Sequence, residues 1–202
     1  MKRKLLALAV VVMCLSLTAY GTLAFFTADT TAHNVITSGN VDIELYEWAD
    51  ESKTEPFPEE GIRDVMPGDT VTKIVEVKNT GSADAYIRVK VEKEIELDVE
   101  QAGSSVDNPD GILEAPKGDA ELLLIDYDDE TWDYNETDGC YYYRTALAPN
   151  EVTAPLFAGV TFDTKMGNEY QNCTARIKVT AYAVQVANNG ATYADAAGWP
   201  EE

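Results

Sequence analysis

The sequence predicts an all-β protein built as an antiparallel β-sandwich. Apolar residues recur at every second position in several separate segments. This period is typical of strands with one buried face, because successive side chains of a strand point to opposite faces. Pro, Gly and Asn mark turns between these segments, and no helical pattern alternates with them. Many short strands without intervening helices favour two packed sheets.

Three strands are expected in the first half of the chain, over residues 41–46, 70–78 and 85–92. In the first and third, apolar residues alternate with the others, and in the second Val71, Val75 and Val77 share one face. The third has the clearest alternation, and its apolar face consists of Ala85, Ile87, Val89 and Val91.

Four strands are expected in the second half. Residues 120–127 form a continuous apolar run, which predicts a strand buried on both sides. The other three cover residues 141–147, 156–162 and 175–183, and residues 190–199 have the composition of a short helix.

Two polar stretches rich in acids, residues 47–64 and 96–118, are predicted to be long surface loops. Tight turns are expected where Pro, Gly or Asn cluster. These clusters occupy residues 66–69, 79–82, 108–111 and 148–150.

Charge and composition exclude several classes of protein. The 202 residues include 15 Lys+Arg and 36 Asp+Glu, which gives a formal net charge of −21. A surface this acidic repels phosphate backbones, so nucleic acid is not an expected partner. His33 is the single histidine, which excludes an HExxH zinc site and a three-histidine metal site.

The N-terminus has the layout of a secretory signal peptide. Residues 2–4 are basic, residues 5–19 are apolar, and small residues follow. Cleavage after Ala24 would make Phe25 the mature N-terminus; a cut after Gly21 is the rival.

Residues 1–24 are therefore assigned to the signal peptide and residues 25–202 to a single domain. An uncleaved anchor is the alternative, because residues 5–28 contain no charged side chain and are long enough to span a bilayer.

The residues offer little for catalysis or cofactor binding. A serine or cysteine hydrolase requires a histidine base. The one histidine, His33, lies in a polar, Thr-rich stretch where a solvated side chain is expected. We predict no catalytic residue, no cofactor and no metal, and we expect the acidic cluster after residue 125 to be a solvated loop. A calcium site in this cluster is the alternative, since calcium takes several carboxylate oxygens. The candidate ligands are Asp126, Asp128, Asp129 and Asp133.

Two cysteines remain after removal of the signal peptide, Cys140 and Cys173. An even pair in an exported chain permits a disulfide, which we predict here. Two separate buried thiols are the alternative.

An aromatic cluster is the other conspicuous feature. On a strand, Tyr141 and Tyr143 share one face and Tyr142 takes the other. One face is expected to pack on the core, and the other offers a contact surface for a partner chain or a sugar. Cross-strand packing is the alternative.

An ordered set of segments resembles the TasA/camelysin family. The N-terminal segments read GTLAFFTAD and GNVDI, the central ones PGDTVTK, VKNTGS and AYIRV, and the C-terminal ones MGNEYQN and IKVTAYAVQ. They occupy residues 21–29, 39–43, 67–73, 77–82, 85–89, 166–172 and 177–185. The resemblance covers nearly the whole chain.

This resemblance implies a jelly-roll sandwich, secreted by Gram-positive bacteria after processing by a dedicated signal peptidase. TasA-like members form fibres of the extracellular biofilm matrix, and camelysin-like members are surface proteins labelled as metalloproteases. The present chain departs from a protease pattern because it lacks HExxH. The two cysteines and the acidic stretch 47–64 are also its own features.

We therefore expect a secreted structural subunit of a matrix fibre or surface layer. Its expected partners are other copies of the same chain, and further candidates are other matrix proteins or wall polysaccharide. A surface-binding module and a camelysin-like metalloendopeptidase are the alternatives.

Residues 25–38 are the predicted assembly strand, because an extended apolar segment can add to the sheet edge of another molecule. The alternative is that this strand folds back into its own sandwich. The apolar residues of this strand are Phe25, Phe26, Val35 and Ile36.

Overall fold

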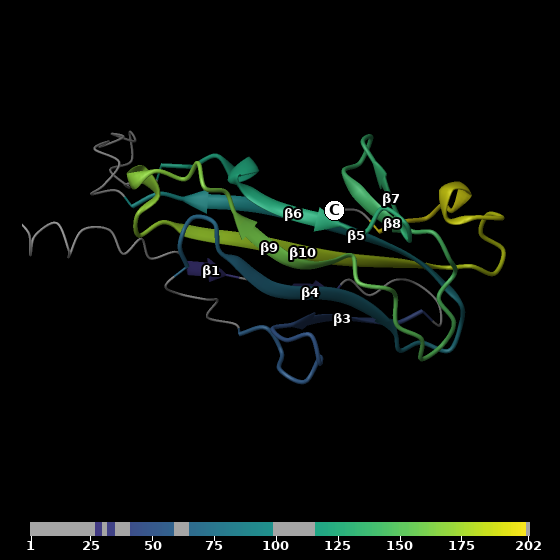
Figure 1. The fold of residues 1–202 in the computed structure, drawn as a ribbon. Helices are drawn as coiled ribbons and strands as arrows, with labels where there is room; N and C mark the ends of the chain where they lie inside the picture. The colour runs from purple at the N-terminus through teal and green to yellow at the C-terminus, as the bar shows by residue number, and fades with distance from the viewer. Residues whose placement is uncertain (1–26, 30–31, 35–40, 59–64, 99–115, 201–202) are drawn as a thin grey trace, which may run out of the picture.

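The computed structural model describes residues 27–29, 32–34, 41–58, 65–98 and 116–200. They form two β-sheets packed face to face (Figure 1). The six-stranded sheet has the order β1-β10-β5-β8-β7, with β2 also on β10, and the four-stranded sheet has the order β3-β4-β9-β6. The predicted all-β sandwich is confirmed.

The strands match most of the predicted segments. Their bounds in chain order are β1 (Thr27–Asp29), β2 (Ala32–Asn34), β3 (Ile43–Trp48), β4 (Thr70–Asn79), β5 (Ala85–Glu96), β6 (Leu123–Tyr127), β7 (Trp132–Asn135), β8 (Cys140–Tyr143), β9 (Phe157–Phe162) and β10 (Thr174–Gln185). Three short 3-10 helices cover Ala120–Leu122, Asn168–Tyr170 and Tyr193–Asp195.

The core lies between the sheets and is built from the alternating faces that the sequence predicts. β5 and β10 are its longest strands and pair antiparallel along their full length, from Thr174↔Glu96 to Gln185↔Ala85. Their inward faces and those of β3, β4 and β9 form one apolar cluster. Its largest apolar side chains with almost no exposure are Trp132, Phe157, Phe162, Ile87, Ile95, Leu123 and Leu156.

Three element predictions are corrected. The run 120–127 is not a strand buried on both sides, because β6 has β9 as its one partner among the described strands and leaves Leu124 46% exposed. The strand predicted over 141–147 ends at Tyr143. β7 was not predicted, because its Asp and Asn residues look like turn residues in the sequence.

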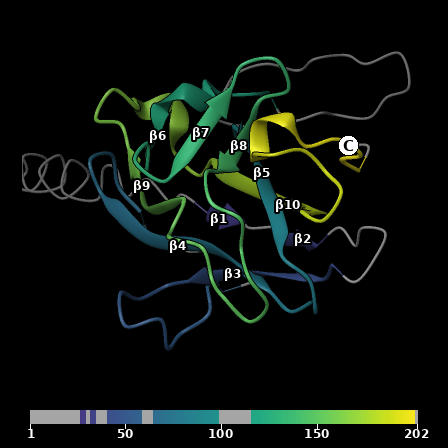
Figure 2. The same cartoon turned by 90° about the vertical axis from the view of Figure 1, so that its right-hand side faces the viewer.

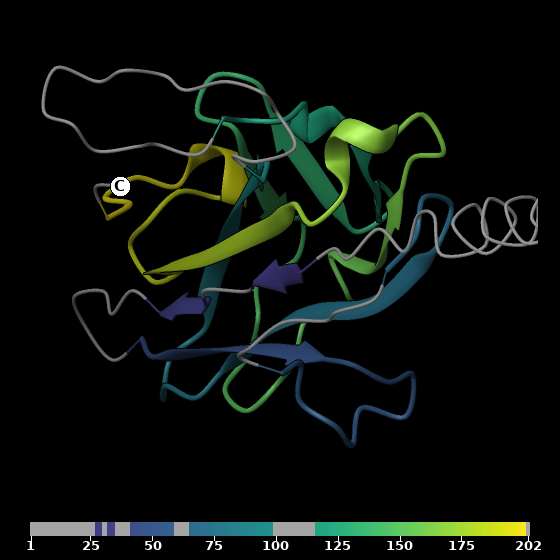
Figure 3. The same cartoon turned by 90° about the vertical axis from the view of Figure 1, so that its left-hand side faces the viewer.

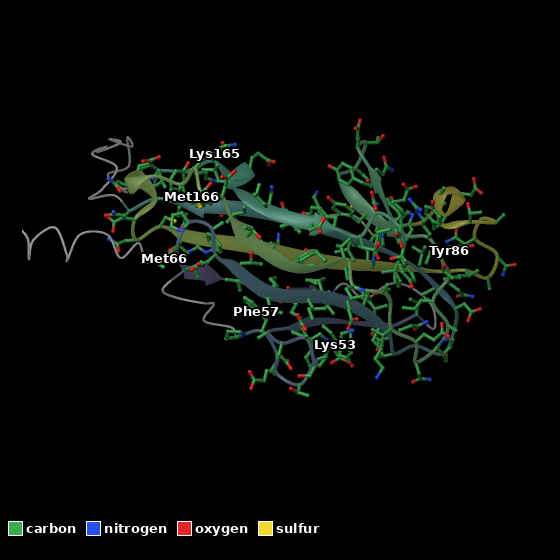
Figure 4. The ribbon with its side chains drawn as sticks, viewed as in Figure 1. Lys53, Phe57, Met66, Tyr86, Lys165 and Met166 are labelled. Carbon is green, nitrogen blue, oxygen red and sulfur yellow. The ribbon has the colours of Figure 1, made fainter. Side chains whose placement is uncertain are left out.

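The acidic stretch 47–64 is only partly a surface loop. Glu47 belongs to β3, and Phe57 is buried although residues 51–56 before it are exposed. Lys53 and Phe57 both come from the loop after β3 (Figure 4). Lys53 forms an ion pair with Glu76 of β4, so this loop is fastened to the four-stranded sheet.

Among the described residues, which do not include 1–26, no helix is long and apolar enough to cross a membrane.

Candidate functional site

The outer edge of β10 carries the N-terminal part of the chain. β10 bonds on one side to β5 over its whole length, and on the other side to β1 and β2 (Figure 3). Both short strands run parallel to β10, with Ala28 opposite Ala175 and His33 opposite Thr180. The antiparallel pattern of the sandwich is therefore broken at this edge.

This pairing concerns the predicted assembly strand. The described parts of residues 25–38 add to the sheet of their own chain, which is the folded-back alternative raised by the sequence. Phe25, Phe26, Val35 and Ile36 lie outside the described residues, as does the predicted cleavage site between Ala24 and Phe25.

The face of β10 that points into the core is continuously apolar. Every second residue from Ala175 to Ala183 is buried at 4% exposure or less. Without β1 and β2, the backbone groups of β10 on this side would have no partner among the described strands. Such an edge is a template for pairing with another strand.

A second cluster lies on the opposite, outward face of the six-stranded sheet, centred on Arg88. Its guanidinium lies against the rings of Tyr182 and Trp199, with ring centroids 4.9 and 5.1 Å from Cζ. It donates hydrogen bonds to Asp138 Oδ2 (3.2 Å) and to the carbonyl of Pro200 (3.1 Å). The C-terminal segment is thereby held over this face (Figure 2).

Tyr142 does not provide the exposed contact surface that the sequence left open. This side chain is only 8% exposed, because Trp199 packs edge-on against it with centroids 5.4 Å apart. Its hydroxyl donates to Asp138 Oδ2 at 2.5 Å, and burial together with this bond raises the pKa of Tyr142. Tyr142 therefore cannot stack on a sugar in this conformation.

The other two tyrosines of β8 take part in aromatic packing. Tyr141 stacks on Tyr127 with centroids 4.3 Å apart, and burial raises the pKa of Tyr127 strongly. Tyr143 packs on Trp132 at 5.0 Å. The cross-strand alternative holds for Tyr143 and Trp132, which oppose each other on the neighbouring strands β8 and β7, whereas the stack of Tyr141 on Tyr127 of β6 joins the two sheets.

The calcium candidates are not brought together. Asp128 accepts hydrogen bonds from Thr131 Oγ1 (2.5 Å) and from the backbone of Glu130 (2.9 Å), which lower its pKa and close a turn. Asp133 accepts from the hydroxyl of Tyr193 at 3.0 Å. Within the described ranges, no three acidic, His or Cys side chains, Asp126 and Asp129 included, gather as a metal site.

The predicted Cys140–Cys173 disulfide is wrong, since both cysteines are free and buried. Cys140 opposes Lys90 of β5, which opposes Thr180 of β10, while Cys173 precedes the start of β10. Thr180, which is level with Cys140, lies seven residues along the chain from Cys173, and this corresponds to roughly 23 Å at about 3.3 Å per residue. A disulfide needs Cα atoms within about 7 Å, so these two cannot bond.

We expect neither thiol to react with iodoacetamide in the native protein at pH 8, and both to react after unfolding in guanidinium. Burial raises the pKa of Cys173 to about 12, so almost no reactive thiolate is present at pH 8. Mass spectrometry of the alkylated protein with and without denaturant measures this. A bridged peptide in a non-reducing digest would contradict it.

Comparison with protein families identifies the chain. A family model described as camelysin metallo-endopeptidase matches residues 1–115. No curated protein and no solved structure matches. The family match covers more than half of the 202 residues and agrees with the N-terminal and central segments that resemble this family. The chain therefore belongs to the camelysin family.

Proposed function

We propose that the chain is an exported structural subunit of an extracellular matrix fibre or surface layer, which assembles through its N-terminal strand. The observation that carries this proposal is the β10 edge, which is covered by two three-residue strands from the N-terminal segment. Family membership supports export to the cell surface.

The pairing at this edge can be exchanged between copies. A segment that pairs with β10 of its own chain makes the same backbone hydrogen bonds with β10 of a second copy. Main-chain bonds supply the affinity of such added strands, and alternate side chains supply the specificity. If each copy gives its strand to the next, the contact is heterologous and does not close, so a filament results.

The sequence of the segment suits this role. Removal of residues 1–24 leaves Phe25 and Phe26 near the new N-terminus, and burying one such ring contributes about 1.5–3 kcal/mol. Residues 25–38 contain neither Pro nor Lys, two residue types that blunt the edges of sheets. Residues 35–40, which follow β2, include Ser38, Gly39 and Asn40, residues that tolerate a change of chain direction.

We expect deletion of residues 25–34 from the mature protein to abolish fibres and to leave a folded, soluble monomer. Electron microscopy and sedimentation detect assembly, and circular dichroism verifies the fold. A matched control, Leu124→Glu on the exposed face of β6, should still form fibres. Fibres formed by the deletion variant would contradict the proposal, and so would its outright unfolding.

A peptide of residues 25–38 provides a second test that leaves the protein intact. Added in excess to the mature protein, it should occupy the β10 edge and stop fibre growth. A peptide with the same composition in scrambled order is the control. Inhibition by both peptides, or by neither, would contradict assembly through this strand.

The description of the family favours one other function, a metallo-endopeptidase. Over residues 41–58, 65–98 and 116–200 the structure offers no cluster of three metal-ligating side chains for such a reaction. Casein cleavage that stops when a chelator is added distinguishes this function from the structural one.

A further inference from the structure

A pocket of about 500 Å³ opens beside the Arg88 cluster, between the β7–β8 hairpin and the C-terminal segment. Figure 2 shows this segment next to β8. The two walls come from parts of the chain about 60 residues apart, joined by the hydrogen bond from Tyr193 to Asp133. The side chains used below are Asp133, Tyr134, Glu136, Tyr142, Tyr193 and Trp199.

The lining combines aromatic rings with carboxylates. Four of these six side chains are aromatic, and Tyr134 is 53% exposed, so its ring is accessible. Asp133 and Glu136 supply two carboxylates, and no Lys, Arg or His is among the residues that line the pocket. Aromatic faces attract cations through the ring quadrupole, and carboxylates add a direct charge attraction.

The protein already uses this cluster to hold one cation of its own. Arg88 lies against Trp199 and is bonded to Asp138, at the side of the cluster away from solvent. Trp199 and Tyr142 are shared between this internal site and the pocket. The Arg88 charge is balanced by Asp138, whereas Glu136 makes no ion pair among the described residues.

We propose that this pocket binds an organic cation, a protonated amine or a quaternary ammonium group. The ammonium lies among the rings of Tyr134, Tyr193 and Trp199, with Asp133 and Glu136 as counter-charges. Arg144 lies 3.7 Å from Asp133 and offsets part of that charge, so Glu136 supplies most of the attraction. This site is separate from the β10 edge and does not depend on fibre formation.

The test uses the full mature protein and two probes, choline and N-acetyl-lysine methylamide, titrated by NMR and calorimetry. We expect saturable shifts at residues 133–137 and at the Trp199 side chain. The neutral isostere of choline, 3,3-dimethyl-1-butanol, should bind at least about fivefold more weakly, because it lacks the charge. Choline stands for a free small molecule, and the lysine derivative stands for a side chain of a partner protein.

A pair of charge-matched variants makes the test specific. Asp133→Asn/Glu136→Gln should weaken choline about threefold to tenfold, the range for two solvent-exposed charge pairs. Asp129→Asn/Glu130→Gln removes the same charge outside the pocket and should leave affinity unchanged. Equal binding of the neutral isostere, equal loss in both variants, absence of binding by both cations, or saturable binding of N-acetylglucosamine in place of the cations would overturn the proposal.

Discussion

Lys73→Met is expected to lower the free energy of unfolding by about 3–5 kcal/mol, the usual cost of removing one partner from a buried ion pair. Lys73 is 2% exposed, and its Nζ lies 2.7 Å from Glu47 Oε1. The same ammonium lies 4.2 Å from the ring centroid of Phe57. Methionine keeps the length and apolar packing of the stem, so the loss reflects the Glu47 carboxylate that is left buried without this cation.

The loss should depend on pH in a defined direction. Burial raises the pKa of Glu47 above its usual 4.5 even in the intact pair, and removal of Lys73 raises it further. When the folded-state pKa of an acid exceeds the unfolded one, stability is fully present below the unfolded pKa and falls as pH rises through the folded value. Urea denaturation should therefore show a larger difference between variant and parent at pH 7.5 than at pH 4.5.

The matched control is the double variant Glu47→Gln/Lys73→Met, which removes both charges. It should recover much of the lost stability, because replacing both members of a buried pair is far less costly than removing one. A single variant as stable as the parent at pH 7.5, or a loss that grows as the pH falls, would contradict this account.

Arg88→Ala is expected to lower the free energy of unfolding by about 2–3 kcal/mol and to release the C-terminal segment. The figure is below the full cost of breaking a buried pair because the Asp138 side chain is 26% exposed. The variant also loses the contacts of the guanidinium with Tyr182 and Trp199 and its hydrogen bond to Pro200. Urea denaturation measures stability, and limited proteolysis after residue 190 measures release.

Two further variants distinguish the effect of the Arg88 side chain from the loss of a positive charge alone. Arg88→Lys keeps the charge but not the planar group that stacks on rings, so we expect it to fall between alanine and the parent. Arg144→Ala removes a cation that is 44% exposed and 3.7 Å from Asp133, and should cost less than about 1 kcal/mol. If Arg88→Ala leaves both stability and proteolysis unchanged, this cluster does not hold the C-terminal segment.

Lys73 and Arg88 are both buried, although the sequence pattern does not predict what buries them. Alternation put Tyr86 and Arg88 on the polar face of β5, yet they are 5% and 7% exposed. The covering segment comes from more than 100 residues further along the chain, so no local pattern could reveal it. Strict alternation puts Lys73 on the same face as Val71 and Val75, and no local pattern reveals the partners of its ammonium, Glu47 and the ring of Phe57.

The sequence by itself determined the fold class and the main strands of this protein, because a two-residue period at Ile87, Val89 and Ile177 reports a buried face whatever packs on it. It also determined the family, through the ordered segments within residues 1–115. Only the tertiary structure decided the partners: β1 and β2 on the edge of β10, Trp199 over Tyr142, and the separation of Cys140 from Cys173. The physical reason is that local spacing determines which side of a strand faces inward, whereas the register between distant strands determines which residues meet.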